Sequence, residues 1–261
     1  MFKLIKIVLL LFGSLAISVI SMSQLDYGIP VLMYHHILPV DENKNFQNNA
    51  AVLNLEDFQR QMQYLYDNRF HTLTTEEVKE VLYDNKKFDD KCVWITFDDG
   101  YYSNLVYAYP ILKNYGFSAT VFVLTSYVTD DMVPFNADEL IYLNWQEMSN
   151  YCDVFDFASH SDNMHEVEVN GLTKLENSTQ DEVIGDIKKS MSYDKINAKY
   201  AFSYPYGGYN DEIINDLKIC GVKIAVTVDE GYIKRFTNPY KIPRFNIYRG
   251  ISFNRFKSIV K

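Results

Sequence analysis

Two adjacent carboxylates, Asp98 and Asp99, are the residues of this sequence whose spacing most directly suggests chemistry. They lie in the segment Thr96-Phe97-Asp98-Asp99-Gly100, and neighbouring carboxylates repel one another unless a cation or hydrogen bonds separate their roles. A metal ion would do so, because one carboxylate could bind the ion while the other remained free as a base. Gly100 would let the chain turn sharply away. The alternative is an ordinary turn, since Asp-Asp-Gly is also a common turn sequence.

Two histidines, His160 and His165, offer the remaining ligands for such a metal site, and they directly follow an apolar run. Two imidazoles and one carboxylate leave coordination positions open for water and substrate, which is typical of a catalytic site. The spacing of five residues requires a short loop, because a regular helix would favour a spacing of four. No cysteine belongs to the group. We therefore expect Zn²⁺, with Co²⁺, Ni²⁺, Mn²⁺ or Fe²⁺ as alternatives.

The elements that must position these residues follow from the pattern after residue 28, where short apolar runs alternate with helical patterns. This alternation predicts β/α units around a largely parallel sheet. We expect eight strands, at Ile29–Tyr34, Phe70–Leu73, Cys92–Phe97, Ala119–Leu124, Val154–Ala158, Tyr200–Tyr204, Ile224–Val228 and Ile242–Ile247. Helices are expected to begin at Asn54, Thr75 and Asn210. The polar stretch 39–51 is expected to form a surface loop.

A single distorted (β/α) barrel of about seven strands is the most economical α/β architecture for this pattern. No repeat, low-complexity tract or linker divides the chain. An open doubly wound sheet is the alternative, but no Gly-x-Gly-x-x-Gly motif follows a strand. In a barrel the carboxyl ends of the strands share the face that carries the active site. The polar groups at these expected ends are His35, Asp98-Asp99, His160, Tyr204-Pro205-Tyr206 and Asp229.

The N-terminus predicts export, because Lys3 and Lys6 precede an apolar run over residues 7–20. Residues 1–23 are expected to be a cleaved signal peptide or a retained N-terminal membrane anchor, although the run is short for a spanning helix. Residues 24–261 are expected to form the single catalytic domain. We therefore expect a secreted or extracytoplasmic protein, either free or held at the cell surface or membrane.

Composition and charge narrow the class of partner. The formal net charge of −9 argues against nucleic acid as a partner, although solubility is a sufficient reason for it. The 21 tyrosines and 17 phenylalanines suit a groove for sugar rings, and equally an aromatic core. Cys92, Cys152 and Cys220 are widely spaced, so we expect buried thiols and not a disulfide framework or a zinc knuckle.

Taken together, the motifs resemble those of the polysaccharide deacetylases of the NodB-homology type, carbohydrate esterase family 4. Residues 96–100 resemble the first motif of this family, and His160-Ser161 followed by His165 resembles its metal-binding motif. Residues 30–36 and 201–207 are similar to a narrower branch, the secreted poly-β-1,6-N-acetyl-D-glucosamine deacetylases of biofilm formation. The resemblance covers nearly all of residues 29–247.

Three features depart from the commoner family pattern. The two histidines of the metal-binding motif are five residues apart instead of four, as in the biofilm branch. Ser203 stands where an arginine usually orients the catalytic aspartate. No histidine follows His165, so the usual C-terminal catalytic histidine is absent. In the biofilm branch the barrel is circularly permuted and this histidine comes from the N-terminal strand. That resemblance implies His35 here, with His36 as the competing candidate.

The resemblance implies a metal-dependent hydrolase that removes N-acetyl groups from an extracellular N-acetylglucosamine polymer. Poly-β-1,6-N-acetyl-D-glucosamine is the expected substrate, and peptidoglycan or a chitin oligomer is the alternative. Asp99, His160 and His165 are implied to hold the metal, with Zn expected and Co or Ni possible as substitutes. Asp98 would be the general base and His35 the general acid. We expect a monomer with peripheral association to the cell surface.

The mechanism that these residues allow assigns supporting roles to other residues. The backbone N–H of Tyr206 is expected to stabilise the oxyanion. Asp229 is expected to orient the catalytic histidine, with Glu230 as a competing candidate and an ordinary turn as the alternative. Contacts to the substrate are expected from Tyr204, Pro205 and Tyr101.

Two other classes of protein fit part of this pattern. An iron oxygenase also uses two histidines and one carboxylate, and His160 and Asp162 have the local spacing of such sites. The parallel β/α pattern and the adjacent carboxylates count against it. A glycan-binding module without turnover is the second alternative, and Ser203 in place of the arginine is its main support. Arg244, in the last expected strand, would either supply a charge near the site or lie exposed at the rim.

Overall fold

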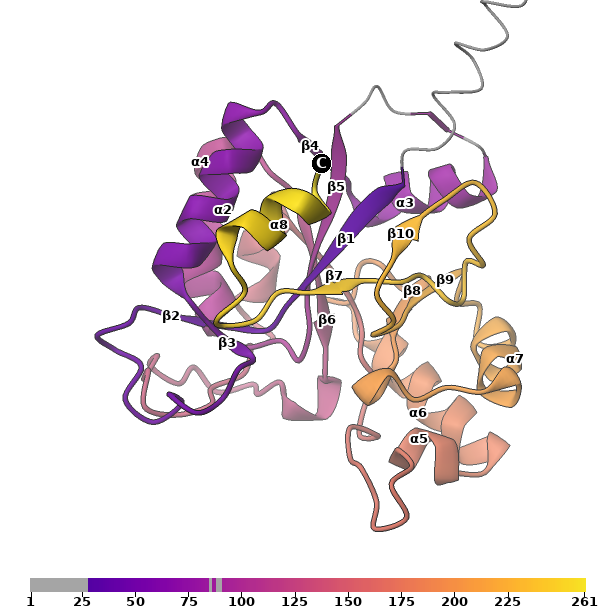
Figure 1. Ribbon diagram of the computed structural model, residues 1–261. Helices are drawn as coiled ribbons and strands as arrows, with labels where there is room; N and C mark the ends of the chain where they lie inside the picture. Colours follow the sequence, from indigo (N-terminus) through magenta and orange to yellow (C-terminus); the bar gives the residue numbers. More distant parts are fainter. Residues whose placement is uncertain (1–27, 85, 88–90) are drawn as a thin grey trace, which may run out of the picture.

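The computed structural model describes residues 28–84, 86–87 and 91–261. The expected N-terminal export segment lies outside the described residues. Within the described part of the chain, no helix is both long enough and apolar enough to cross a membrane. Figure 1 shows a curved central sheet with helices packed around it.

The strands of the central sheet are β1 (Ile29–Tyr34), β5 (Cys92–Phe97), β6 (Ala119–Val123), β7 (Phe155–Ser159), β8 (Ala201–Ser203), β9 (Ile224–Val226) and β10 (Tyr232–Ile233). They are hydrogen-bonded in the order β10-β1-β5-β6-β7-β8-β9. Every neighbouring pair from β1 to β9 is parallel, and only the short β10 runs antiparallel to β1. The predicted parallel β/α sheet is therefore confirmed.

The last strand, β11 (Phe245–Asn246), connects the two ends of the sheet. It pairs in parallel with β1, and a parallel bridge joins Val226 of β9 to Ile242, three residues before β11. Residues 242–246 thus lie between the last and the first long strands. The result is the distorted barrel of about seven strands that the sequence predicts.

Shorter strands lie outside this barrel. β4 (His71–Thr72) pairs with the start of β5, where the sequence predicts a longer strand. β2 (His36–Leu38) and β3 (Val52–Asn54) form a separate parallel pair that the sequence analysis missed. They flank the polar stretch 39–51, most of which is exposed, as expected for a surface loop.

The helices lie in two groups around the sheet (Figure 1). On one flank α2 contacts both α4 and α8, and on the other α6 packs against α7. The helices are α2 (Leu55–Asp67), α3 (Thr75–Tyr83), α4 (Tyr109–Tyr115), α5 (Lys174–Asn177), α6 (Gln180–Ser192), α7 (Asp211–Ile219) and α8 (Phe253–Ile259). The three predicted starts are confirmed: Asn54 and Asn210 are N-caps, and α3 begins at Thr75. A π-helical turn, η1 (Asn104–Ala108), precedes α4.

Alternation along β5 decides which side chains enter the barrel. Val93, Ile95 and Phe97 pack outward against the helices, whereas Trp94 packs inside with Phe122. Successive side chains of a strand point to opposite faces, so the residue after Phe97 points inward again. That residue is Asp98, which thereby lies at the end of the barrel interior.

The cysteines differ in part from the prediction of buried thiols. Cys92 is buried, as expected, but Cys220 is only partly buried and Cys152 is exposed. Cys152 follows the short turn η3 (Met148–Tyr151) at the surface. An apolar local sequence therefore did not suffice to bury a thiol in a connection between strands.

A tight turn follows β8, and its backbone conformation generates a testable expectation. Gly207 has φ 75°, and a Cβ added there would lie 2.3 Å from Cγ2 of Val228. Gly207→Ala should therefore lower the free energy of unfolding by more than about 1 kcal/mol, measured by urea denaturation. Gly221→Ala is the matched control, because Gly221 has φ 87° but no atom within 4 Å of the added Cβ. An equal loss in the two variants would contradict the clash with Val228.

Candidate metal centre and catalytic residues

Five of the predicted residues come together at the carboxyl end of the barrel. Asp98 and Asp99 follow β5, His160 follows β7, and His35 follows β1. His165 lies in the loop beyond His160. Since these strands are parallel neighbours or near neighbours, their ends meet on one face.

The predicted metal ligands form one compact cluster. Oδ1 of Asp99 lies 3.5 Å from Nε2 of His160 and 3.4 Å from Nε2 of His165. One ligand atom from each residue lies within 4.8 Å of the others, and no other such group occurs among the described residues. Oδ1 of Asp99 is buried and has no hydrogen-bond partner within the described part of the chain. A buried carboxylate oxygen that faces two imidazole nitrogens in this way fits a divalent cation.

The protonation of the histidines supports this interpretation. Nδ1 of His160 lies 2.8 Å from the carbonyl oxygen of Ser203, which can only accept a hydrogen bond. Nδ1 therefore carries a proton, which leaves Nε2, on the side of Asp99, as the nitrogen that could bind a metal. Burial, followed by the nearby His160, lowers the pKa of His165 to about 4, although Asp99 acts in the opposite direction. His165 is therefore neutral at pH 7, as a metal ligand must be.

The backbone around the cluster adopts left-handed conformations. Asp99 has φ 73°, Gly100 φ 74° and Ser161 φ 76°. Non-glycine residues rarely adopt positive φ, and such strain is concentrated at functional sites. The predicted sharp turn at Gly100 is confirmed, and it lets Asp99 leave the strand direction that Asp98 continues.

Arg244 holds the second carboxylate. Its Nη1 and Nη2 donate to Oδ1 and Oδ2 of Asp98, both at 2.7 Å, and its Nε donates to the carbonyl of Thr227 at 2.8 Å. The Arg244 side chain is fully buried, so this is a bidentate ion pair shielded from water. Ser203, which occupies the usual arginine position, donates to Asp98 at 3.3 Å and accepts from Arg244 at 3.1 Å. The sequence was compatible with Arg244 either near the site or exposed at the rim, and the structure places it beside Asp98.

The ion pair sets the charge of Asp98. Burial by itself would raise the pKa of Asp98, but the charge and hydrogen bonds of Arg244 outweigh it and hold this pKa well below its usual range. Asp98 is therefore ionised at neutral pH. Because the folded-state pKa is depressed, the pair stabilises the fold above a pH of about 4 and loses this effect only as the pH falls through the depressed value.

The two adjacent histidines of the N-terminal strand occupy different surroundings. Tyr34 pairs with Phe97, and the N–H of Asp98 donates to the carbonyl of Tyr34, so His35 lies next to Asp98 at the strand ends. His36 is 3% exposed, its Nδ1 lies 2.6 Å from Oγ of Ser103, and burial lowers its pKa to about 4. Its ring stacks on Tyr101. The geometry therefore favours His35 as the histidine that faces the site.

Two predicted aromatic residues lie around the cluster. The ring of Tyr206 stacks on His165 with centroids 4.2 Å apart, and Tyr206 itself is 54% exposed. Tyr101 stacks on Tyr142, and burial and then the neighbouring Asp99 raise the pKa of Tyr101. Both phenols therefore flank the predicted metal ligands.

Other predicted residues lie elsewhere. Tyr204 is 1% exposed and its hydroxyl donates to the carbonyl of Tyr240, so this side chain is part of the core and not of a groove. Pro205 is also buried. Asp229 is exposed and accepts a hydrogen bond from Tyr209 at 3.3 Å, and no hydrogen bond or ion pair of the described residues joins it to His35. Its orienting role stays a prediction.

The competing acidic residues are engaged with other partners. Glu230 pairs with Arg255 at 3.0 Å. The carboxylate of Asp162 accepts from Lys189 at 2.7 Å and from Thr125 at 2.8 Å. Because Asp162 is turned toward these partners, the ligand pattern of an iron oxygenase built on His160 and Asp162 is not formed.

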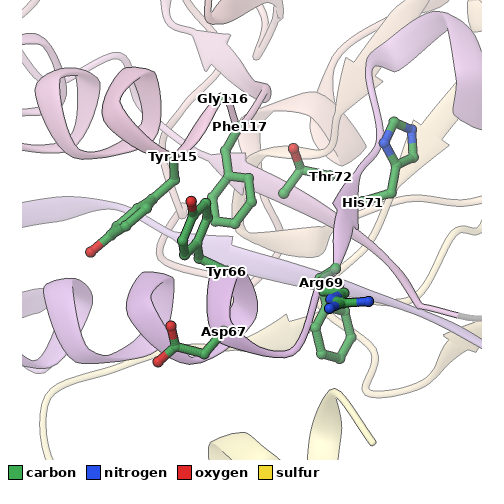
Figure 2. A pocket seen from close by; sticks show the side chains of 9 residues that line it. Tyr66, Asp67, Arg69, His71, Thr72, Tyr115, Gly116 and Phe117 are labelled. Carbon is green, nitrogen blue, oxygen red and sulfur yellow. The ribbon is translucent and has the colours of Figure 1, made fainter.

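A cavity of about 600 Å³ lies at the opposite end of the sheet (Figure 2). It is lined by the C-terminal ends of α2 and α4 and by residues at the start of β4, among them Tyr66, Arg69 and Tyr115. β4 pairs with the beginning of β5, whereas the carboxylates follow the end of β5. This cavity is therefore separate from the metal centre.

Comparison with known proteins agrees with this geometry. Residues 85–225 match the family model described as polysaccharide deacetylase. Polysaccharide deacetylase YxkH of Bacillus subtilis is 30% identical over 233 residues, which cover 89% of this chain and 76% of the relative. The chain belongs to the polysaccharide deacetylase family. It is thus a hydrolase that removes acetyl groups from a polysaccharide. The cluster of Asp99, His160 and His165 lies at the carboxyl end of its barrel.

Other relatives point in the same direction. A poly-β-1,6-N-acetyl-D-glucosamine N-deacetylase of Staphylococcus aureus is 33% identical to the deacetylase, over 88% of this chain and 81% of the relative. The solved Streptococcus pyogenes deacetylase PplD, in complex with acetate, superposes with a TM-score of 0.77 at 28% identity and covers 90% of this chain and 99% of its own. IcaB from Ammonifex degensii shares the fold, with a TM-score of 0.74 at 19% identity over 89% and 95% of the two chains.

The Asp98–Arg244 pair of the deacetylase generates a prediction for stability. Arg244→Met should lower the free energy of unfolding at pH 7 by about 3–5 kcal/mol, because it leaves Asp98 buried and unpaired. The deficit should shrink as the pH falls and Asp98 becomes protonated, since burial without Arg244 raises its pKa. Urea denaturation at pH 7 and pH 5 measures both effects.

The control for this prediction is the exposed pair of Arg255 and Glu230, whose side chains are 49% and 61% exposed. Arg255→Met should cost less than about 1 kcal/mol at either pH. A similar loss of unfolding free energy in the two arginine variants would show that the buried Asp98–Arg244 pair stabilises the fold no more than an exposed pair does.

Proposed function

We propose that this deacetylase is a metal-dependent enzyme that removes N-acetyl groups from an extracellular polymer of β-1,6-linked N-acetylglucosamine. The observation that carries the proposal is the arrangement of an ionised Asp98, held by Arg244, beside the cluster of Asp99, His160 and His165. The relatives in Staphylococcus aureus that are named for this activity support the choice of polymer. The residues of the cluster fit Zn²⁺ best, with Co²⁺ or Ni²⁺ as substitutes.

A divalent ion held by the cluster would lower the pKa of a water molecule and polarise the acetyl carbonyl. Asp98 would accept a proton from the attacking water, and the two hydrogen bonds from Arg244 hold its carboxylate ionised at neutral pH. The same ion pair makes Asp98 a weak base. Asp98 therefore does not retain the proton, and efficient turnover requires that the proton move on to the departing product.

The remaining steps use groups on the other strand ends. His35, in its protonated form, donates a proton to the leaving amine, which would otherwise depart poorly. The backbone N–H of Tyr206 stabilises the developing negative charge on the acetyl oxygen, since Tyr206 is held in the turn η4 (Pro205–Gly207) beside His165. The exposed ring of Tyr206 offers an apolar face to a sugar ring.

The ion pair also bears on the alternative of a glycan-binding module without turnover. That alternative rested on the missing arginine at the position of Ser203, and Arg244, in the segment just before β11, supplies a guanidinium to Asp98 instead. The apolar run of residues 7–20 supports the further proposal that the enzyme acts outside the cytoplasm, as a secreted or surface-held monomer.

Acetate release is the direct test of this function. The purified enzyme should release acetate from β-1,6-linked N-acetylglucosamine oligomers, and release should stop with a chelator and return with added Zn²⁺. Chitin oligomers and peptidoglycan fragments, which present the same acetamido group in other linkages, are the comparison substrates. Faster release from either of these would overturn the proposed linkage. No release with Zn²⁺, Co²⁺ or Ni²⁺ would overturn the proposed metal-dependent activity.

Two substitutions separate the proposed base from the proposed ligands. Asp98→Asn should bind metal as tightly as the parent but lose turnover by at least about 10²-fold, because the general base is gone. His160→Ala should lose both metal binding and turnover, because one of three ligands is gone. Metal affinity is measured by competition with a chromophoric chelator, and turnover by acetate release. Parent-like turnover in Asp98→Asn would refute the assignment of the base.

A further inference from the structure

Helix α6 contacts the loop that carries the two proposed histidine ligands. Residues 160–165 follow β7 and contain neither helix nor strand, and Ser161 has φ 76°. Residues 160–162 make backbone hydrogen bonds to residues 123–126, which fixes His160. Among the described residues no backbone–backbone hydrogen bond involves residues 163–165, so such bonds do not fix the separation of His165 from His160. Some other part of the molecule must therefore determine that separation.

Helix α6 presents three polar side chains to this loop, Asp186, Lys189 and Ser190. Their spacing of three and four residues places them on one face of the helix. Ser190 contacts Oγ of Ser159, at the end of β7, at 2.6 Å. This face of α6 therefore contacts both the last residue of β7 and the loop that comes after it.

Asp186 makes the central contacts. Its Oδ1 accepts from the N–H of Asp162 at 2.8 Å, and its Oδ2 accepts from the N–H of Asn163 at 2.7 Å. Asp162 and Asn163 lie between the two histidines in the sequence. Burial raises the pKa of Asp186, and the two N–H groups oppose that rise, so its hydrogen bonds are those of a largely shielded carboxylate.

Asp162 is held as well, and in a direction away from the metal cluster. Its carboxylate is 4% exposed and accepts from Lys189 and Thr125, and its carbonyl accepts from the N–H of Ser126. Both oxygens of this buried carboxylate are thus satisfied on the side of α6 and η2 (Thr125–Tyr127). The loop is therefore fixed at its side chains and at its backbone.

We propose that Asp186 is a positioning residue, which sets the separation of His160 and His165 by binding the two backbone N–H groups between them. The inference rests on the proposed metal site and adds to it the element that shapes it. A loop held in this way has its two imidazoles in place before the ion arrives, so metal binding does not have to order the loop. Residues that orient metal ligands commonly contribute about 10–100-fold to metal affinity.

The test compares Asp186→Asn with Asp181→Asn, a substitution of the same kind at an exposed position of the same helix. Asparagine keeps one acceptor oxygen but places an amide donor opposite the second backbone N–H. Asp186→Asn should weaken the binding of Zn²⁺ by about 10–100-fold, measured by competition with a chromophoric chelator. Asp181→Asn should leave the affinity unchanged. An unchanged affinity in Asp186→Asn, or an equal loss in the control, would overturn the inference.

Hydrogen exchange of the metal-free protein supplies a readout that does not depend on activity. The amide protons of Asp162 and Asn163 should exchange slowly in the parent and faster in Asp186→Asn, whereas the amides of β7 should be unchanged. Equal protection of both loop amides in the two proteins would also overturn the inference. Zn²⁺ binding by the parent is measured in the same series, so its absence would be a failure of the proposed function and not of the role of Asp186.

A milder pair of variants keeps the test decisive if Asp186→Asn does not fold. Lys189, whose side chain is 60% exposed, binds Asp162, whereas its neighbour Lys188 is exposed on the same helix. Lys189→Gln should weaken Zn²⁺ binding in the same direction as Asp186→Asn, and Lys188→Gln should not. Equal affinities in these two lysine variants would overturn the proposal that α6 shapes the ligand loop.

Discussion

Two buried carboxylates on consecutive residues each need a positive partner of their own, and the rest of the site is organised around this constraint. Asp98 continues the inward direction of β5 and meets Arg244, whereas Asp99 leaves the strand through a left-handed turn toward the two histidines. A single cation between them would leave one charge poorly compensated in the low dielectric of the interior. Separate partners allow one carboxylate to serve as a base and the other as a metal ligand.

The closure of the barrel supplies the first of these partners. Arg244 is 146 residues from Asp98 in the sequence, and it reaches the interior because residues 242–246 lie between β9 and β1. The site therefore depends on an early strand, a middle strand and the last strand at once. The second partner requires a loop instead of a strand, and α6 restrains that loop. Rigid elements thus hold both halves of the site, which is what accurate placement of catalytic groups requires.

Much of the fold could be predicted because buried parallel strands are apolar throughout. β1 and β5 have the predicted bounds, and six further strands lie within or overlap their predicted ranges. β2, β3 and β10 were missed, because each has two or three residues and lies outside the runs of four to six residues from which strands were predicted. Tyr204 was assigned to the substrate groove because it ends a strand, but it packs in the core, since a chain so rich in tyrosine also uses them as apolar side chains.

By itself the sequence determined which residues gather at the candidate site: their types and their places at strand ends identified Asp98, Asp99, His160 and His165, and the family motifs implied His35. Only the tertiary structure decided how they are held. One sign was available in advance, because Arg244 is the only charged residue of the predicted strand Ile242–Ile247, but its partner could not be inferred from the pattern. Hydrophobic periodicity reports which face of an element is buried. The Asp98–Arg244 ion pair and the hydrogen bonds from α6 to the loop 160–165 depend instead on which elements become neighbours when the barrel closes. That is a property of the packed chain.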